Sequence, residues 1–224
     1  MIILESINCC IVVIKKANEK GWVQMGIMLE IKELLIIALP MLMIFRAFSI
    51  LKSRRRGQFS IKREIVINLF YVYILCFIGI TLFPLFINWN GQEGNSSINL
   101  VPVFRTINDV SISFQQPEMK NFMIKFWIKN ILGNMLLLVP LGLLLPILRR
   151  KFGNMKNILL FSFLFSFGIE SIQFLSYYIG NFGRSFDIDD IILNTLGAWI
   201  GFIFYKKIVL KLVNKKVLKD IQVN

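Results

Sequence analysis

Residues 158–179, ILLFSFLFSFGIESIQFLSYYI, form a long and almost wholly apolar run. It is apolar apart from hydroxyl groups, Glu170 and Gln173. A helix needs about 20 predominantly apolar residues to cross the hydrocarbon core of a bilayer. Because the bilayer interior offers no water to unpaired peptide groups, a crossing segment of this kind must be helical. The stretch therefore predicts a membrane-spanning helix that carries one acid.

Four further runs, at residues 34–51, 65–86, 130–148 and 188–205, are also apolar and of spanning length. None of them alternates apolar and polar residues, which disfavours a membrane β-barrel. Over the 224 residues, 56% are hydrophobic and 17% are charged, whereas ordinary soluble domains have about 45–50% and about 25%. The sequence predicts an all-α fold, a polytopic membrane bundle of about five transmembrane helices.

The net charge of +13 is distributed between the apolar runs. Residues 52–64 carry six Lys or Arg, residues 149–157 carry four, and residues 206–224 carry six. This distribution is typical of membrane topology rather than of a nucleic-acid-binding face. Basic loops stay in the cytoplasm, so the C-terminus is predicted to be cytoplasmic and the start of the first helix to lie outside.

The chain is predicted to have three parts: an N-terminal segment at 1–33, a five-helix transmembrane domain at 34–205, and a basic cytoplasmic tail at 206–224. The first segment fits either a short helix in the membrane interface or a true start at Met25 or Met28. A helix that is apolar on one side is expected from Pro117 onward, running into the third span.

Polar side chains fall at one depth of three spans. Asn130 and Asn134 lie in the outer half of the third span, and Glu170 and Gln173 in the outer half of the fourth. The fifth begins outside, and its outer end carries Asp187, Asp189, Asp190 and Asn194, with Arg184 in the preceding loop. An ionisable residue within a membrane span is by default a candidate for function. The sequence predicts a polar, acidic pocket in the outer half of the membrane.

Structural roles are alternatives for several of these residues. Asp187 or Asp189 could cap the fifth helix, and the asparagines could join helices by hydrogen bonds. Gly197 and Gly201, four residues apart, predict close helix packing. Pro140 and Pro146 predict kinks in the third span.

Carboxylates suit hard cations, so Asp187, Asp189 and Asp190 are candidate ligands of a divalent cation such as Mg²⁺. No other cofactor is expected. Arg184 could bind a phosphate directly through its planar fork of donors. The sequence contains no histidine, which excludes mechanisms that use an imidazole base.

An ordered set of motifs over residues 80–205 resembles the VanZ-like family. NLVPVF at 99–104 is similar to its NL-x-PF element, with Val103 inserted between Pro and Phe. NILGN at 130–134 followed by VPLG resembles N-x-x-GN…PLG, and ESIQ at 170–173 resembles E-x-x-Q. GRSFDIDD at 183–190 followed by NTLG resembles R-x-x-D-x-DD…N-x-x-G.

The resemblance implies a multi-pass protein of the bacterial cell membrane, and the family's namesake is associated with low-level teicoplanin resistance. Together with the polar pocket, it suggests a protein that binds a membrane lipid head group, a peptidoglycan-precursor lipid or a glycopeptide antibiotic. The expected ligand-binding residues are Asn99, Asn130, Asn134, Glu170, Gln173, Arg184, Asp187, Asp189, Asp190 and Asn194. The alternatives are a metal-dependent enzyme acting on a polyprenyl-linked lipid and an ion-coupled transporter with Glu170 as the carrier.

Overall fold

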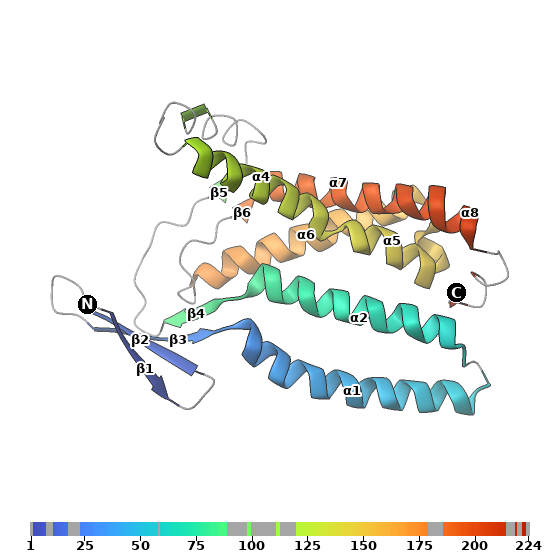
Figure 1. Cartoon of the computed structure of the whole chain (residues 1–224), viewed down its shortest axis with the longest axis horizontal. Helices are drawn as coiled ribbons and strands as arrows, with labels where there is room; N and C mark the ends of the chain where they lie inside the picture. The colour runs from blue at the N-terminus through green and yellow to red at the C-terminus, as the bar shows by residue number, and fades with distance from the viewer. Residues whose placement is uncertain are drawn as a thin grey trace. The chain divides into compact units, whose positions relative to one another are not determined.

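The structure is a computed structural model. It describes residues 2–7, 11–17, 23–57, 59–88, 98–99, 111–112, 120–178, 186–213, 218 and 221–222, with the backbone alone for residues 2–28. Within this part of the chain, five helical stretches are long and apolar enough to cross a membrane (Figure 1). They are Ile31–Arg55, Ile61–Leu82, Asn121–Leu148, Met155–Ser176 and Ile188–Leu212. The predicted all-α polytopic bundle is confirmed.

Contacts divide the chain into two units. The first consists of Met1–Phe59, Tyr71–Ser97 and Ser171–Phe186, and the second of Ser60–Phe70, Ile98–Glu170 and Asp187–Asn224. The second unit contains most of the residues predicted to form the polar pocket.

In the first unit, α1 (Ile31–Arg55) begins before the predicted run because a capping box fixes its start. The N–H of Glu30 donates to Oε2 of Glu33 over 2.7 Å, which satisfies a peptide donor that the helix leaves unpaired. The helix ends at a left-handed residue, Gly57 with φ 64°, whose N–H donates to the carbonyl of Arg54 over 3.0 Å. Glycine takes this conformation without a Cβ clash.

Helix α2 (Ile61–Leu82) belongs to the first unit from Tyr71 onward, and this part contacts α1. The rings of Phe45 and Tyr71 meet edge to face, and the guanidinium of Arg46 lies 5.5 Å from the centre of the Tyr71 ring. Helix α2 stops at Leu82 rather than at residue 86 because Pro84 disfavours a helical residue before it. The residues that follow, β4 (Leu85–Asn88), form a strand instead.

Strand β4 belongs to a four-stranded antiparallel sheet with β1 (Ile2–Ile7), β2 (Ile11–Ala17) and β3 (Val23–Leu29), in the order β1-β2-β3-β4. Leu29 pairs with Leu85 at the end of this sheet. The described backbone of the N-terminal segment is therefore extended, where the sequence suggested an interfacial helix or a later start. Pairing with neighbouring strands satisfies the backbone N–H and C=O groups of this segment.

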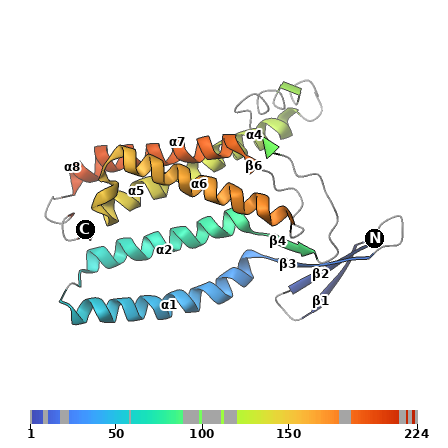
Figure 2. The same cartoon turned by 180° about the vertical axis from the view of Figure 1, so that it is seen from behind.

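The second unit is built around α4 (Lys120–Leu137), α5 (Val139–Leu148), α6 (Met155–Tyr178, up to Glu170 in this unit) and α7 (Ile188–Phe204). Leu138 separates α4 from α5, and Pro140 occupies the first turn of α5. The helix is therefore interrupted next to Pro140, where the sequence predicted a kink. The turn η1 (Arg150–Gly153) leads into α6, and η2 (Tyr205–Val209) and α8 (Leu210–Leu212) continue α7. Figures 1 and 2 both show α5 and α7 side by side.

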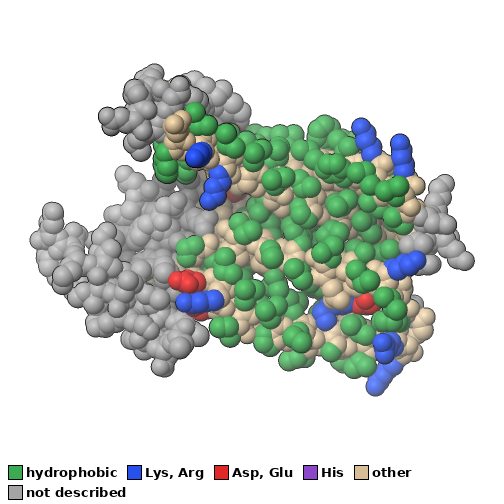
Figure 3. Space-filling model, viewed as in Figure 1, with side chains coloured by type: hydrophobic (Ala, Val, Ile, Leu, Met, Phe, Trp, Pro, Cys, Tyr) green, Lys and Arg blue, Asp and Glu red, His purple; other side chains and the backbone are tan. Residues whose placement is uncertain are grey.

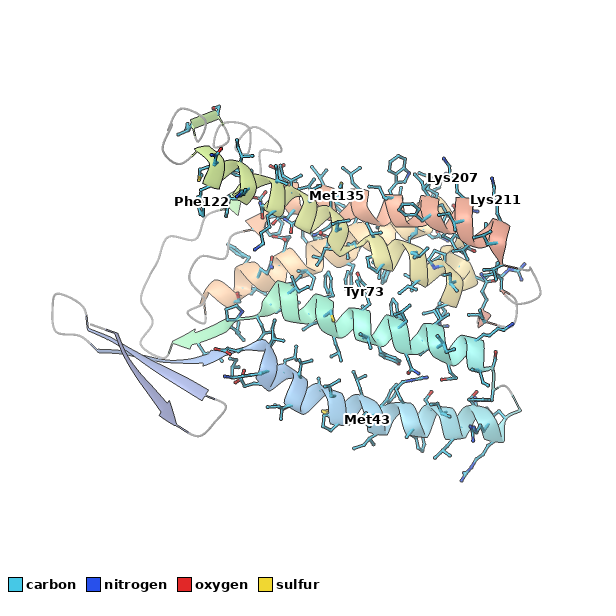
Figure 4. All side chains as sticks on the ribbon, viewed as in Figure 1. Met43, Tyr73, Phe122, Met135, Lys207 and Lys211 are labelled. Carbon is cyan, nitrogen blue, oxygen red and sulfur yellow. The ribbon has the colours of Figure 1, made fainter. Side chains whose placement is uncertain are left out.

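Three glycines bring α7 against α4 and α5. A Cβ atom added at Gly197 would lie 1.8 Å from the carbonyl oxygen of Met135, and one at Gly201 would lie 2.1 Å from that of Val139. A Cβ at Gly142 would lie 2.0 Å from the carbonyl oxygen of Ala198. These distances are far below van der Waals contact, so the helix backbones touch directly. The predicted close packing at Gly197 and Gly201 is confirmed; Figure 4 labels Met135 where α4 meets α7.

The outer surfaces of the helices are apolar. In α1 alone, Met43 and Ile44 are each 72% exposed, and Figure 3 shows apolar side chains over most of the described surface in that view. Lys and Arg side chains lie mainly toward the helix ends, and Lys207 and Lys211 extend outward beyond α7 (Figure 4). Apolar flanks with basic ends are what a lipid-exposed helix requires.

Replacing Gly197 or Gly201 by alanine is expected to destabilise the protein. The added methyl group forces α7 away from α4 or α5, a strain of about 1–3 kcal/mol, which outweighs the gain of about 1 kcal/mol in helix propensity. Thermal unfolding of the detergent-solubilised protein measures the effect. Gly133→Ala and Gly168→Ala are matched controls, because no described atom lies within 4 Å of either added Cβ. Equal stability of all four variants would contradict the packing.

Candidate functional site

Polar side chains from three helices of the second unit form three hydrogen-bonded links, and the residues of these links are referred to below as the polar cluster. Helix α4 contributes one residue, α6 two, and the start of α7 four. Its members are Asn134, Ser166, Glu170, Asp187, Asp189, Asp190 and Asn194.

The first link of the polar cluster joins α4 to α7. The side-chain amide of Asn134 donates a hydrogen bond to Oδ1 of Asp190. The two residues are 56 positions apart in the sequence, so the bond fixes the two helices relative to each other. Hydrogen bonds to a charged group are roughly twice as strong as neutral ones.

The second link joins α6 to the start of α7. The backbone N–H of Asp187 donates to Oε2 of Glu170 over 3.2 Å. Asp187, in β6 (Phe186–Asp187), also caps α7, because its Oδ1 accepts from the N–H of Asp189 over 2.9 Å. The capping role suggested by the sequence is therefore filled by Asp187. Glu170 is only 3% exposed and Asp189 only 8%.

The third link lies one turn deeper along both helices. The amide of Asn194 donates to Oγ of Ser166 over 2.9 Å. Asn194 is 3% exposed, and its Oδ1 is buried with no hydrogen-bond partner among the described residues. This oxygen is an exception to the general pairing of buried polar atoms.

The sequence reasoning overlooked Ser166 and its neighbour Ser162, which are both fully buried. Their spacing would have identified them, because Ser162, Ser166 and Glu170 recur every four residues and therefore share one face of α6. The hydroxyl of Ser162 donates to the carbonyl of Ile158 over 2.7 Å, which is a local bond within the helix. A polar stripe in an apolar helix would have marked this face as facing protein.

Four other predicted residues do not enter these links. Gln173 belongs to the first unit, where its amide donates to the carbonyl of Thr81 over 2.8 Å. Asn130 is exposed on α4. Asn99 lies in β5 (Ile98–Asn99), which pairs with β6; its side chain is outside the described residues, and so is Arg184.

The polar cluster combines four carboxylates with two carboxamides and one hydroxyl. Asp187, Asp189 and Asp190 lie at the N-terminus of α7, where the helix dipole favours negative charge. Within the described residues, no group of three or more His, Cys, Asp and Glu side chains is placed to hold a metal ion. The arrangement is suited to accepting hydrogen bonds from a donor or cation.

Residues 70–211 match the family model described as VanZ/LLP1. The chain belongs to the VanZ/LLP1 family. The matched region includes the whole polar cluster and the part of α2 from Phe70 onward, and α1 precedes it. Together with the five apolar helices, the match makes this a VanZ-like multi-pass membrane protein. No curated protein and no solved structure matches the chain.

The cap at Asp187 gives a prediction specific to this end of α7. Asp187→Ala removes the acceptor for the N–H of Asp189 and is expected to lower stability by about 0.5–2 kcal/mol. Asp187→Asn and Asp187→Ser retain a capping oxygen and are expected to unfold close to the wild-type temperature. Thermal unfolding in detergent distinguishes them. If the alanine and asparagine variants lose stability equally, the charge of Asp187 matters rather than its cap.

Proposed function

We propose that this VanZ-like protein binds the head group of a cell-envelope lipid or lipoglycopeptide at the polar cluster, and contributes in this way to tolerance of teicoplanin-type glycopeptides. The observation that carries the proposal is the Asn134–Asp190 hydrogen bond, which gathers polar groups of separate spans. A peptidoglycan-precursor lipid is one ligand of this kind.

Energetics favour a functional role for the polar cluster. A carboxylate near the centre of a bilayer costs at least about 2.5–3.5 kcal/mol on insertion scales. Glu170 and Asp189 are both nearly inaccessible within helices of spanning length. Apolar side chains of similar size would hold the same helices together without that penalty. A set of buried acids is better explained by a ligand that uses them.

Charge distribution supports access from the outer leaflet of the cell membrane. In the second unit, the basic residues Arg149, Arg150, Lys206 and Lys207 follow the C-terminal ends of α5 and α7. The positive-inside rule assigns these ends to the cytoplasm, and with them the C-terminus. The start of α7 and the polar cluster then lie in the outer half of the membrane.

The proposed roles follow from side-chain chemistry. Arg184, three residues before Asp187, would bind a phosphate or carboxylate of the ligand through its planar fork. Asp189 and Asp190 would orient this arginine by accepting hydrogen bonds from it. Asn99 and Asn130 complete the proposed ligand-binding set in the second unit, and Gln173 is a further candidate in the first unit.

Antibiotic susceptibility tests the proposal. Expression of the wild type in a sensitive host is expected to raise tolerance of teicoplanin and not of vancomycin, and Asp190→Asn is expected to abolish the effect because it removes the charge while keeping an acceptor for Asn134. Glu30→Gln is the matched control, since it removes one acid outside the VanZ/LLP1 region. Unchanged tolerance with confirmed membrane expression of the wild type would count against the proposal.

A further inference from the structure

Exposed basic side chains surround the turn between α5 and α6. Arg149, Arg150 and Lys151 lie at the end of α5 and in η1, and Lys156 lies in the first turn of α6. Residues 149–169 contain no Asp or Glu, so no acid of this segment offsets the charge. The turn therefore presents net positive charge to its surroundings.

The end of α7 carries three more exposed cations, Lys206, Lys207 and Lys211. They lie among exposed apolar side chains, since Ile208 is 46% exposed and Leu212 is 79% exposed. A lysine beside exposed apolar groups is typical of the level of the lipid head groups, where its stem contacts hydrocarbon and its ammonium group reaches the polar layer. These cations are therefore placed to meet lipid head groups.

The two basic segments lie at the same end of the second unit. A Cβ atom added at Gly153 in η1 would lie 4.0 Å from the hydroxyl of Tyr205, the first residue of η2. Figures 1 and 2 both show α5 and α8 ending on the same side, and Figure 4 labels Lys207 and Lys211 there. The exposed basic residues of the two segments are referred to below as the basic end.

The C-terminal segment is docked at the basic end. Leu218 and Ile221 are buried, and the side-chain amide of Gln222 donates to the carbonyl of Pro146 over 3.0 Å. This carbonyl lies in the last turn of α5, where carbonyl groups lack partners within the helix. The side chain of Gln222 is also hydrogen-bonded to that of Tyr205. The short chain between α8 and Gln222 is therefore held at the basic end from both sides.

This docked segment adds to the positive charge. Residues 214–222 include three lysines, Lys215, Lys216 and Lys219, and one acid, Asp220. A free tail would spread these lysines over many positions, whereas the bonds of Gln222 confine them to the basic end.

The chemistry of the partner follows from charge and position. A surface with a large excess of cations attracts anions, and basic clusters next to a membrane helix attract anionic lipids. A zwitterionic lipid such as phosphatidylcholine carries an ammonium group that cancels the charge of its phosphate. The exposed apolar side chains beside Lys211 favour a lipid over a soluble anion, because they offer contact to acyl chains.

We infer that the basic end binds the head group of an anionic membrane lipid such as phosphatidylglycerol, and that the docked C-terminal segment is part of the binding surface. With the orientation proposed above, the lipid belongs to the cytoplasmic leaflet. The inference goes beyond the proposed function, which concerns the opposite end of α7.

Isothermal titration of the purified full chain in detergent tests the inference. The probes are dioctanoyl phosphatidylglycerol and dioctanoyl phosphatidylcholine, which share acyl chains, so that a difference reports the head group. Phosphatidylglycerol is expected to bind at least about tenfold more tightly, equivalent to about 1.4 kcal/mol. Glycerol phosphate, which has no acyl chains, is the third probe and is expected to bind more weakly than phosphatidylglycerol. Equal binding of the two lipids would overturn the inference, and equal binding of glycerol phosphate would overturn the assignment to a lipid.

A pair of double variants locates the contact. Lys206→Gln with Lys207→Gln is expected to weaken phosphatidylglycerol binding at least about tenfold, because each cation near a membrane surface contributes about fivefold. Lys125→Gln with Lys129→Gln is the matched control, since it removes two exposed lysines from α4 at the other end of the same unit. The control is expected to bind as the wild type does. Equal losses in both double variants would show that net charge alone attracts the lipid, and would overturn the assignment to the basic end.

Gln222→Ala tests the part played by the docked segment. It removes the bonds to Pro146 and Tyr205 and is expected to weaken phosphatidylglycerol binding about fivefold, the effect of one cation. Unchanged binding would overturn the contribution of this segment. Thermal unfolding shows whether each variant is folded, and the wild-type comparison of lipids needs no variant. Teicoplanin tolerance is tested separately by Asp190→Asn, so failure of the lipid test and failure of the proposed function are distinguishable.

Discussion

The direct backbone contact of α7 with α4 and α5 is the constraint on which the second unit depends. It exists because Gly142, Gly197 and Gly201 have no side chain at the places where neighbouring carbonyl groups approach. Lipid tails are as apolar as leucine, so burying apolar surface does not drive association of helices in a membrane. Close van der Waals contact and interhelical hydrogen bonds have to supply the stability. The glycines provide the first and bring the backbones near enough for the second.

The polar cluster follows from this contact. With Gly197 against Met135, the part of α7 two turns earlier lies beside α4, where Asp190 meets Asn134. Glu170 then accepts from the backbone at the start of α7, so α6 is tied to the same end. Packing and site are thus parts of one arrangement.

Much of the architecture could be predicted from the sequence because the bilayer restricts the choices. A long apolar run has to be a helix, so the spans were identifiable, and the spacing of Gly197 and Gly201 identified the face of close contact. Boundaries were harder, because the capping box of Glu30 and the strand that follows Pro84 are set by local and non-local hydrogen bonds. The pairing of β3 with β4 joins segments far apart in the chain, and no local sequence pattern predicts it.

The sequence indicated which residues form the site better than it indicated their hydrogen-bonding partners. Spacing placed Asn134, Asp190 and Asn194 among the candidates, and the structure links each of them to another helix. Spacing did not distinguish Asn134 from the exposed Asn130 on the same face of α4, because only the position of α7 decides which of the two is covered. Ser166 was overlooked because serine is common in membrane helices, and its role becomes visible only in the hydrogen bond that it accepts from Asn194.

The most direct test of this account is a double-mutant cycle between Asn134→Ala and Asp190→Ala, measured by thermal unfolding of the solubilised protein. Side-chain hydrogen bonds between membrane helices contribute about 0.6 kcal/mol on average. We expect a favourable coupling energy of at least about that size between the two side chains. Strictly additive effects of the two substitutions would show that α4 and α7 do not meet at these residues, and would contradict it.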